Sequence, residues 1–271
     1  MTTDQIHLHI EDTGGDGRPV VLIHGWPLSG ESWADQIGAL SDAGYRVITY
    51  DRRGFGQSGK EGRRYDYDTL ADDLNAVLTS LDLRDATLVG FSMGGGEVAR
   101  YAARYGLKRI RSVVFAAAVP PYLMAGEDNP NGPLDEGTFK GMRSSLEEDR
   151  EGFLDEFTTG FFSVNGQLAV SEEQRQDALR MARQSDQQAA LECMDAWATT
   201  DFRGDLAAVQ VPTLVIHGDS DGTVPFEGSG KRTHKAIEGS ELELNKAAPH
   251  GLTVSHSGEF NAALLTFLKK H

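Results

Sequence analysis

The chain has 271 residues, a length that suits one α/β domain with an insertion or at most two domains. Its formal net charge of −15 argues against nucleic acid and anionic membrane surfaces as partners. The single cysteine, Cys193, cannot form an intrachain disulfide. Met1–Gln5 lacks the features of a signal peptide, and no apolar run approaches the roughly 18 residues of a membrane span. The sequence therefore predicts a protein of the cytoplasm.

Apolar strands and amphipathic helices alternate up to residue 119. A continuous apolar run such as residues 19–23 is typical of a strand that is buried on both faces. This order of elements predicts an α/β fold with a mainly parallel sheet covered on both sides. The expected strands are residues 6–10, 19–23, 46–50, 86–89 and 112–116, and the expected helices are residues 32–43, with Ser32 as N-cap, 67–81 and 94–105.

The pattern changes between residues 120 and 205. Four prolines mark a loop, and four helices are then expected with no strand between them, at residues 138–149, 151–162, 171–184 and 187–199. We therefore expect a core domain of residues 1–119 and 206–271, with residues 120–205 inserted as a helical cap. Pro27 is a candidate for lining a substrate pocket. Five cap aromatics are candidates too, although each could equally pack inside the cap: Phe153, Phe157, Phe161, Phe162 and Trp197.

The sheet resumes with strands at residues 212–216 and 241–245, and the chain closes with a helix at residues 260–270. In parallel sheets, ligands bind beyond the carboxyl ends of the strands. The segments His24-Gly25-Trp26 and Asp51-Arg52 and the residue Ser92 each follow a strand directly. They are therefore expected to share one edge of the sheet.

The motif Gly90-Phe91-Ser92-Met93-Gly94 has the Gly-x-Ser-x-Gly form of a nucleophile elbow. An apolar strand precedes it and a helix rich in small residues follows it, which is the context that the motif requires. The turn would expose the Ser92 hydroxyl, and the helix N-terminus would favour negative charge that develops beside it. The pattern predicts a nucleophilic serine.

Two other glycine-rich segments match phosphate-binding motifs only in part. Residues 94–99 fit Gly-x-Gly-x-x-Ala, but the next strand carries no acidic residue that could hold a ribose. Residues 228–231 lack the Ser or Thr that must follow the lysine of a P-loop. No metal-ligand spacing is present either, so no cofactor and no metal are expected.

A serine nucleophile needs a histidine base that a carboxylate orients, in the chain order Ser, Asp or Glu, His. His250 lies on the loop after the last strand, where this base is expected. Asp219 and Asp221 both follow the preceding strand, and the residues alone leave the choice between them open. His217, at the end of that strand, is expected to be structural.

The oxyanion of an acyl-transfer reaction needs two backbone donors. The expected donors are the N–H groups of Met93, which follows the nucleophile, and Trp26, in the loop after an earlier strand. Pro27 is expected to hold the Trp26 carbonyl toward the site, where it could accept a hydrogen bond from peroxide, or else only to shape the loop. The loop of residues 51–58 is expected to brace Trp26 through Asp51 and Arg52, with substrate contact as the alternative.

These segments together resemble the α/β-hydrolases called cofactor-free (non-heme) haloperoxidases and their relatives, the bacterial aryl esterases. The resemblance rests on residues 24–29, 51–58, 90–101 and 248–251. It implies the α/β-hydrolase fold and selects Asp221 as the acid, because that aspartate is followed by Val224-Pro225 in the family pattern. Members usually have one more strand before residue 6, so one edge of this sheet could be shorter.

The implied activity is hydrolysis of small aryl esters through an acyl-enzyme, together with perhydrolysis of carboxylic acids to peracids that oxidise halides. The implied partners are small esters, carboxylic acids and peroxide, and the oligomeric state stays open, a homo-oligomer included. The alternatives are a hydrolase of another carbonyl compound, such as a lactone, and a non-catalytic binding protein on the same fold. Ser92 excludes the chemistry of related enzymes that carry Asp at the elbow.

Overall fold

A seven-stranded sheet with the order β1-β3-β2-β4-β5-β8-β9 forms the centre of the computed structural model, which describes residues 6–271. β1 is antiparallel to β3, and all other neighbouring strands are parallel. The expected α/β class is confirmed. The expectation that Met1–Gln5 does not belong to a signal peptide concerns residues outside the described part of the chain. The strands of this sheet are β1 (Ile10–Asp12), β2 (Pro19–Ile23), β3 (Arg46–Tyr50), β4 (Ala86–Phe91), β5 (Ile110–Ala116), β8 (Thr213–Gly218) and β9 (Glu241–Asn245).

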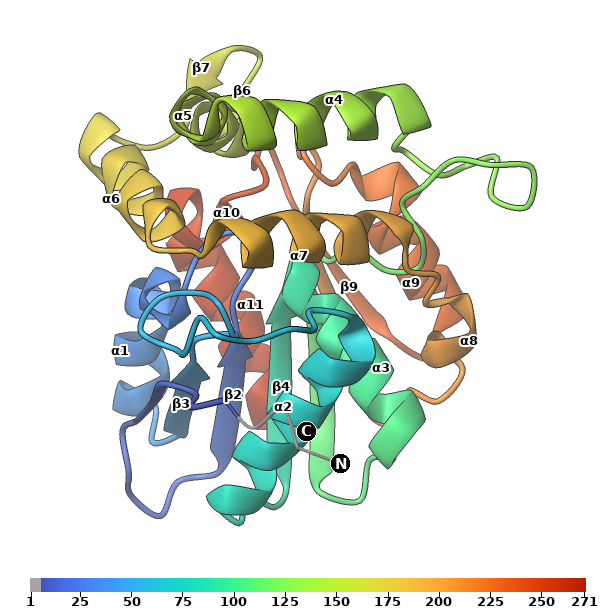
Figure 1. Cartoon of the computed structure of the whole chain (residues 1–271). Helices are drawn as coiled ribbons and strands as arrows, with labels where there is room; N and C mark the ends of the chain where they lie inside the picture. Colours follow the sequence, from blue (N-terminus) through green and yellow to red (C-terminus); the bar gives the residue numbers. More distant parts are fainter. Residues whose placement is uncertain (1–5) are drawn as a thin grey trace.

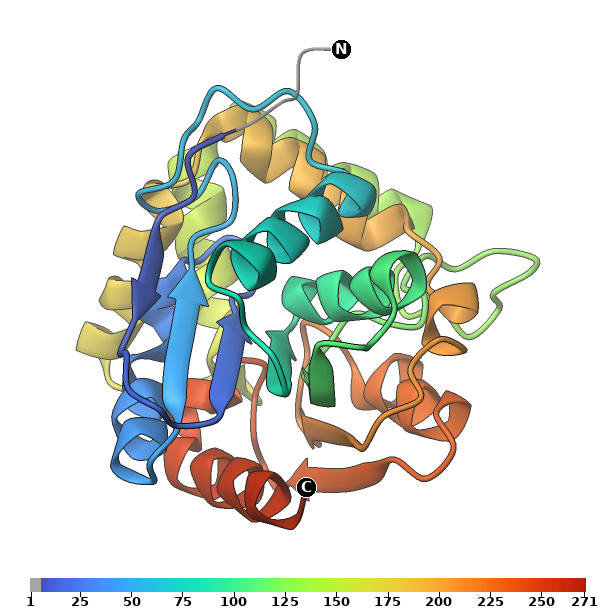
Figure 2. The ribbon, with the colours of Figure 1, turned by 90° about the horizontal axis from the view of Figure 1, so that it is seen from below.

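Helices cover both faces of the sheet and the carboxyl ends of its strands (Figures 1 and 2). α2 and α3 lie on one face, α1 and α11 lie on the other, and α4 to α7 lie above the strand ends. The helices are α1 (Ala34–Asp42), α2 (Tyr67–Ser80), α3 (Met93–Tyr105), α4 (Glu136–Glu148), α5 (Arg150–Phe161), α6 (Glu172–Arg183), α7 (Gln187–Thr199), α8 (Arg203–Leu206), α9 (Gly230–Ala236), α10 (Leu252–Ser255) and α11 (Ser257–Lys270), with 3-10 turns η1 (Gly30–Trp33) and η2 (Phe226–Gly228).

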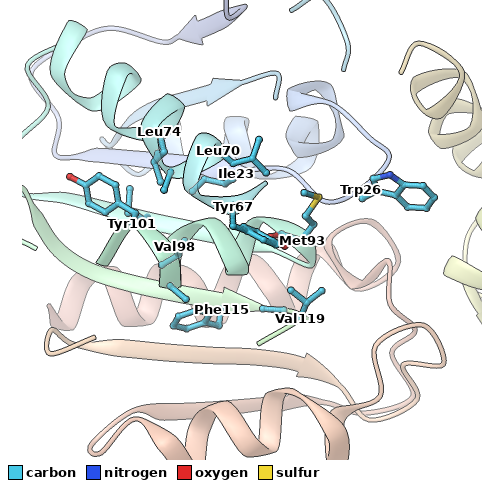
Figure 3. Close-up of a cluster of buried hydrophobic side chains, with 14 of the residues drawn as sticks. Ile23, Trp26, Tyr67, Leu70, Leu74, Met93, Val98, Tyr101, Phe115 and Val119 are labelled. Atoms are coloured by element: carbon cyan, nitrogen blue, oxygen red, sulfur yellow. The ribbon is translucent and has the colours of Figure 1, made fainter. Parts of the chain in front are cut away.

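Burial on both faces explains why β2 is apolar at every position. Val21 and Ile23 pack into a cluster beneath α2 and α3, whereas Val20 and Leu22 pack into a second cluster with α1 and α11. Figure 3 shows the first cluster, with Trp26 at its edge. Both sides of the strand exclude water, so the end of β2, and the loop that follows it, is held firmly in place.

The helices above the sheet begin at short polar side chains that accept a hydrogen bond from the first turn. Asp135, Asp149 and Asp186 do so for α4, α5 and α7, and Ser171 forms a capping box with Gln174 at the start of α6. Such caps satisfy backbone N–H groups that have no partner within the helix. They explain why the expected and observed helix ends agree closely in this region.

One expectation for residues 120–205 is wrong: a strand pair does interrupt the helices. β6 (Ser163–Val164) and β7 (Gln167–Leu168) form an antiparallel hairpin between α5 and α6. Its turn is Asn165-Gly166, and both residues have positive φ, 51° and 77°. Asn-Gly is the preferred pair for such a two-residue turn, so the sequence contained a signal for the hairpin.

The expected strand at residues 6–10 is largely wrong, because β1 begins only at Ile10. The backbone of the preceding segment bonds instead to the loop after β3: the carbonyls of His7 and His9 accept from Gly59 N and Asp51 N, both at 2.9 Å. This segment runs past the end of β3, where no strand remains to pair with it.

The expectation that Ser32 caps the first helix is also wrong. Ser32 lies inside η1, and its hydroxyl donates to the Ser29 carbonyl at 2.7 Å. The α-helix itself begins at Ala34, after this tighter turn.

Within residues 6–271, no helix is both long and apolar enough to cross a membrane.

Candidate active site

Ser92 lies in a sharp turn between β4 and α3. Its φ is 54° and its ψ is −118°, a strained conformation for a residue with a side chain. Neighbouring backbone holds the turn: Ser92 N donates to Ala116 O at 2.8 Å, and Ser92 O accepts from Val119 N at 3.2 Å. A Cβ at Gly90 or Gly94 would come within 2.5 Å of a backbone oxygen, so both glycines are required by close approach.

A chain of two hydrogen bonds joins Ser92, His250 and Asp221. Ser92 Oγ lies 2.9 Å from His250 Nε2, and His250 Nδ1 lies 2.7 Å from Asp221 Oδ2. The three residues come from the turn after β4, the loop after β9 and the loop after β8. The histidine can therefore accept the serine proton through Nε2 while the carboxylate orients its ring through Nδ1.

Asp221 is a buried carboxylate with an environment that favours its ionised form. Burial opposes ionisation most strongly, but the favourable electrostatic interaction with His250 and the hydrogen bonds with His217 and His250 outweigh it and lower the pKa of Asp221 below its ordinary value. Its Oδ1 accepts from the N–H groups of Thr223 and Val224 at 2.9 and 2.7 Å. Oδ1 therefore binds the backbone, whereas Oδ2 contacts His250.

The structure separates the two candidate acids that follow β8. Asp219 is exposed, and its Oδ1 accepts from Ala247 N at 2.7 Å, which ties the loop after β8 to the loop after β9. Only Asp221 reaches His250. His217, which we expected to be structural, lies 3.3 Å from Asp221 Oδ2 through Nε2, so it also contacts the acid.

Trp26 reaches Ser92 from the loop after β2. A Cβ at Gly25 would lie 3.2 Å from Ser92 Cβ, so this glycine lets the loop pack directly against the elbow. Among the described residues, neither Trp26 N nor Met93 N donates a hydrogen bond to another group of the protein. Both amides are therefore available as hydrogen-bond donors. The Trp26–Pro27 peptide bond is cis.

A cavity of about 540 Å³ opens onto Ser92 beneath α4, α5 and α7. Three of the expected aromatic residues line it: Phe153 and Phe157 in α5, and Trp197 in α7. Their rings surround Trp26, with centroid separations of 6.2, 5.0 and 6.1 Å. The indole Nε1 of Trp26 also donates to Ala190 O in α7 at 3.0 Å, so this residue joins the sheet edge to the helices above it.

Three expected pocket residues, Phe161, Phe162 and Pro27, do not line this cavity. Phe161 is buried and packs edge-on against the His250 ring, with centroids 4.9 Å apart. It sits one turn of α5 beyond Phe157, and this turn carries it away from the cavity to the base. Pro27 is buried in the loop itself.

In residues 6–271, no group of three or more His, Cys, Asp or Glu side chains could hold a metal ion.

The comparison with known proteins agrees with this architecture. The family model described as the alpha/beta hydrolase fold matches residues 18–252. The chain belongs to the α/β hydrolase fold family. The family expected from the sequence motifs is thus confirmed.

Within that family, the most informative relatives are non-heme haloperoxidases and an esterase. The chain is 43% identical over 272 residues to the non-heme chloroperoxidase of Kitasatospora aureofaciens, an alignment covering 99% of this chain and 98% of that protein. It is 35% identical over 271 residues to the bifunctional esterase/perhydrolase of Acinetobacter calcoaceticus, with coverage of 99% and 98%. The crystal structure of a bromoperoxidase from Bacillus anthracis matches with a TM-score of 0.95 and 55% identity, over 97% of this chain and 96% of that one.

A buried ion pair lies behind the Trp26 loop of this α/β hydrolase. Arg52, in the loop after β3, pairs with Glu97 in α3, and each side chain is 1% exposed. Arg52 also donates to His24 O at 2.6 Å, and Tyr50 donates to Glu97 at 2.6 Å. The loop of residues 51–58 therefore braces the strand end before Trp26 through Arg52, as expected. The contributions of Tyr50 and Glu97 to this network were not predicted from the sequence.

His24 takes part in the same network as a neutral ring. Burial and the charge of Arg52 hold the pKa of His24 well below its ordinary value. Its Nδ1 then donates to Gly25 O at 2.8 Å, while its Nε2 accepts from Arg52 N at 2.9 Å. The network thus fixes the backbone on both sides of the turn that leads to Trp26.

Breaking this ion pair is expected to destabilise the fold strongly. Glu97→Gln leaves the Arg52 guanidinium buried without a counter-charge, which should lower the free energy of unfolding by about 3–5 kcal/mol. Denaturation in urea would measure the loss. The double variant Arg52→Met with Glu97→Leu removes both charges and should recover much of that loss. A Glu97→Gln variant as stable as the parent would contradict the role of the pair.

Proposed function

We propose that this protein is a serine hydrolase that cleaves small carboxylic esters, aryl esters included, through an acyl-enzyme on Ser92. The observation that carries the proposal is the hydrogen-bonded chain Ser92–His250–Asp221 at the floor of an apolar cavity. A serine hydroxyl with a base in hydrogen-bond reach, and an orienting carboxylate behind that base, is the arrangement needed for nucleophilic attack on a carbonyl carbon.

In the first half of the reaction, Ser92 Oγ attacks the ester carbonyl while His250 Nε2 takes the hydroxyl proton. The charge that forms on the carbonyl oxygen is stabilised by the N–H groups of Trp26 and Met93. His250 then gives its proton to the alcohol oxygen as the C–O bond breaks. The alcohol leaves, and the acyl group stays on Ser92.

In the second half, water attacks the acyl carbon, and His250 again transfers the proton. Hydrogen peroxide can take the place of water, in which case the released product is a peracid. When a carboxylic acid supplies the acyl group, the balance is acid plus hydrogen peroxide to peracid plus water. The peracid then oxidises halide in solution, where it is reduced back to the acid, so the oxidant of the whole sequence is peroxide. We propose that the Trp26 carbonyl, held by Pro27, accepts a hydrogen bond from the attacking peroxide.

The cavity supports a substrate preference and a division of the chain. Phe153, Phe157 and Trp197 offer apolar area with few polar anchors, which favours short acyl chains and aromatic alcohols with loose selectivity. We propose that residues 1–119 and 206–271 form the catalytic core, and that residues 120–205 form a cap that shapes this pocket. This proposed division is supported by the placement of α4 to α7 above the strand ends (Figure 1).

The perhydrolase route makes bromination depend on a carboxylic acid. Bromination of a dye is expected in the presence of bromide, peroxide and acetate, and not with bromide and peroxide in an acid-free buffer. The absorbance of the dye measures the rate. Ser92→Ala is the matched control, because it leaves every other group in place and removes only the acyl carrier. Full bromination by that variant would refute the peracid route.

A further inference from the structure

One face of α5 points into the cavity and carries a single charge. The cavity-lining residues of this helix are Phe153, Glu156, Phe157 and Gly160, which follow the i, i+3, i+4, i+7 spacing of one helix face. Two of the four are aromatic and one is glycine. Glu156 is the only ionisable residue among all those that line the cavity.

The charge of Glu156 is not offset by a neighbour. Among the described residues, its carboxylate makes no salt bridge or hydrogen bond, whereas the adjacent Asp155 pairs with Arg175 at 2.9 Å and Glu151 pairs with Arg183 at 2.8 Å. Glu156 is also exposed, so its carboxylate is in contact with water. An unpaired carboxylate therefore stands at the opening of an apolar cavity.

The surrounding cap carries most of the protein's excess charge. Residues 120–205 contain 18 acidic and 7 basic side chains, a net charge of −11, whereas the whole chain has −15. A cleft with low-dielectric walls focuses the field of such a charge distribution. The negative potential of the cap and the carboxylate of Glu156 thus act in the same direction on a substrate that enters.

We propose that Glu156 makes this site select its substrates by charge, so that uncharged and cationic esters are favoured and anionic esters are rejected. The inference rests on the ester-cleaving function proposed above and names the substrate class for it. A carboxylate on the alcohol or acyl part of an ester would meet an unpaired negative charge with no cation among the cavity-lining residues to receive it. An ammonium group at the same place would be attracted.

Three esters with the same acetyl group would test this inference. They are methyl para-acetoxybenzoate, which is neutral, the para-acetoxybenzoate anion, and para-acetoxyphenyl-trimethylammonium. Their kcat/KM values are compared at low ionic strength, in wild type and in Glu156→Gln. The variant should raise the ratio of the anionic to the neutral ester, and lower the ratio of the cationic to the neutral ester, each by about five-fold. This size corresponds to one charge at roughly 8 Å in an effective dielectric of about 40.

The control variant is Glu173→Gln. Glu173 lies in the first turn of α6, is exposed, and does not line the cavity, but its replacement changes the cap charge by the same amount. Its ratios should stay close to those of wild type. Added salt, which reduces the Debye length to about 8 Å at 0.15 M, should weaken the charge preference of wild type.

Each outcome separates this inference from the proposed function. If wild type does not cleave the neutral ester, the ester-cleaving function fails, and the inference fails with it. If the neutral ester is cleaved but Glu156→Gln leaves both ratios unchanged, the charge selection is wrong while the ester-cleaving function stands. Equal shifts in Glu173→Gln would also overturn it, because they would assign the effect to net charge and not to Glu156.

Discussion

Ser92→Ala is expected to lower kcat on an aryl acetate by roughly 10⁶-fold, the size of the loss when the nucleophile of a serine protease is removed. The physical reason is that His250 then has no hydroxyl to deprotonate at the point where the substrate carbonyl would sit. Ser92 Oγ makes the hydrogen bond to His250 Nε2 at 2.9 Å, so the substitution deletes the reacting atom and leaves the fold around it. Initial rates of phenolate release would measure the loss.

The control for this variant is another buried serine. Ser112 in β5 is 1% exposed, and its Oγ lies 2.8 Å from Thr87 Oγ1, far along the strand from the elbow. Ser112→Ala removes the same atom from the core, and it should leave kcat close to the wild-type value. A Ser92→Ala variant with a tenth of the wild-type activity would rule out Ser92 as the nucleophile.

Asp221→Asn is expected to lower kcat by about 10⁴-fold, as the equivalent change does in a serine protease. The amide oxygen of the new side chain would stay on the N–H groups of Thr223 and Val224, which now bind Asp221 Oδ1 at 2.9 and 2.7 Å. The NH₂ group would then face His250 Nδ1 and donate to it. The ring would carry its proton on Nε2 and could no longer accept the proton of Ser92.

Asp219→Asn is the matched comparison, two residues earlier in the same loop. Its carboxylate is exposed and holds Ala247 N, so its replacement should change kcat by less than the change at Asp221, with a small loss of loop stability. The two variants are compared side by side with the same ester. If Asp219→Asn proved to be the inactive one, the structure would have placed the wrong carboxylate on His250.

Local patterns were sufficient for most of the frame that carries the site. The apolar run of β2 and the small residues of α3 predicted a buried strand and a closely packed helix, because burial and close approach restrict which residue types can stand there. Other elements were missed for local reasons. The short helices α8, α9 and α10 span four, seven and four residues, too few for a helical period to show.

The candidate site divides in the same way. Ser92 and His250 could be placed from a motif and from chain order, since each stands on a loop whose position follows from the strand before it. The roles of the cap aromatics could not be predicted from their type. Phe157 lines the cavity and Phe161, one turn later, packs on His250, and the difference depends on how α5 lies over the sheet.

The sequence by itself determined the fold class, the elbow and the identity of the serine and the histidine, because these depend on short-range rules of sterics and hydrogen bonding. The residues alone left Asp219 and Asp221 open, and only the family resemblance favoured Asp221. The tertiary structure decided between them by bringing one carboxylate 2.7 Å from His250 and turning the other to the surface. It also decided that Glu156 faces the cavity without a partner. Both outcomes depend on which segments far apart in the chain meet, and a distance across the fold is not encoded in any local pattern.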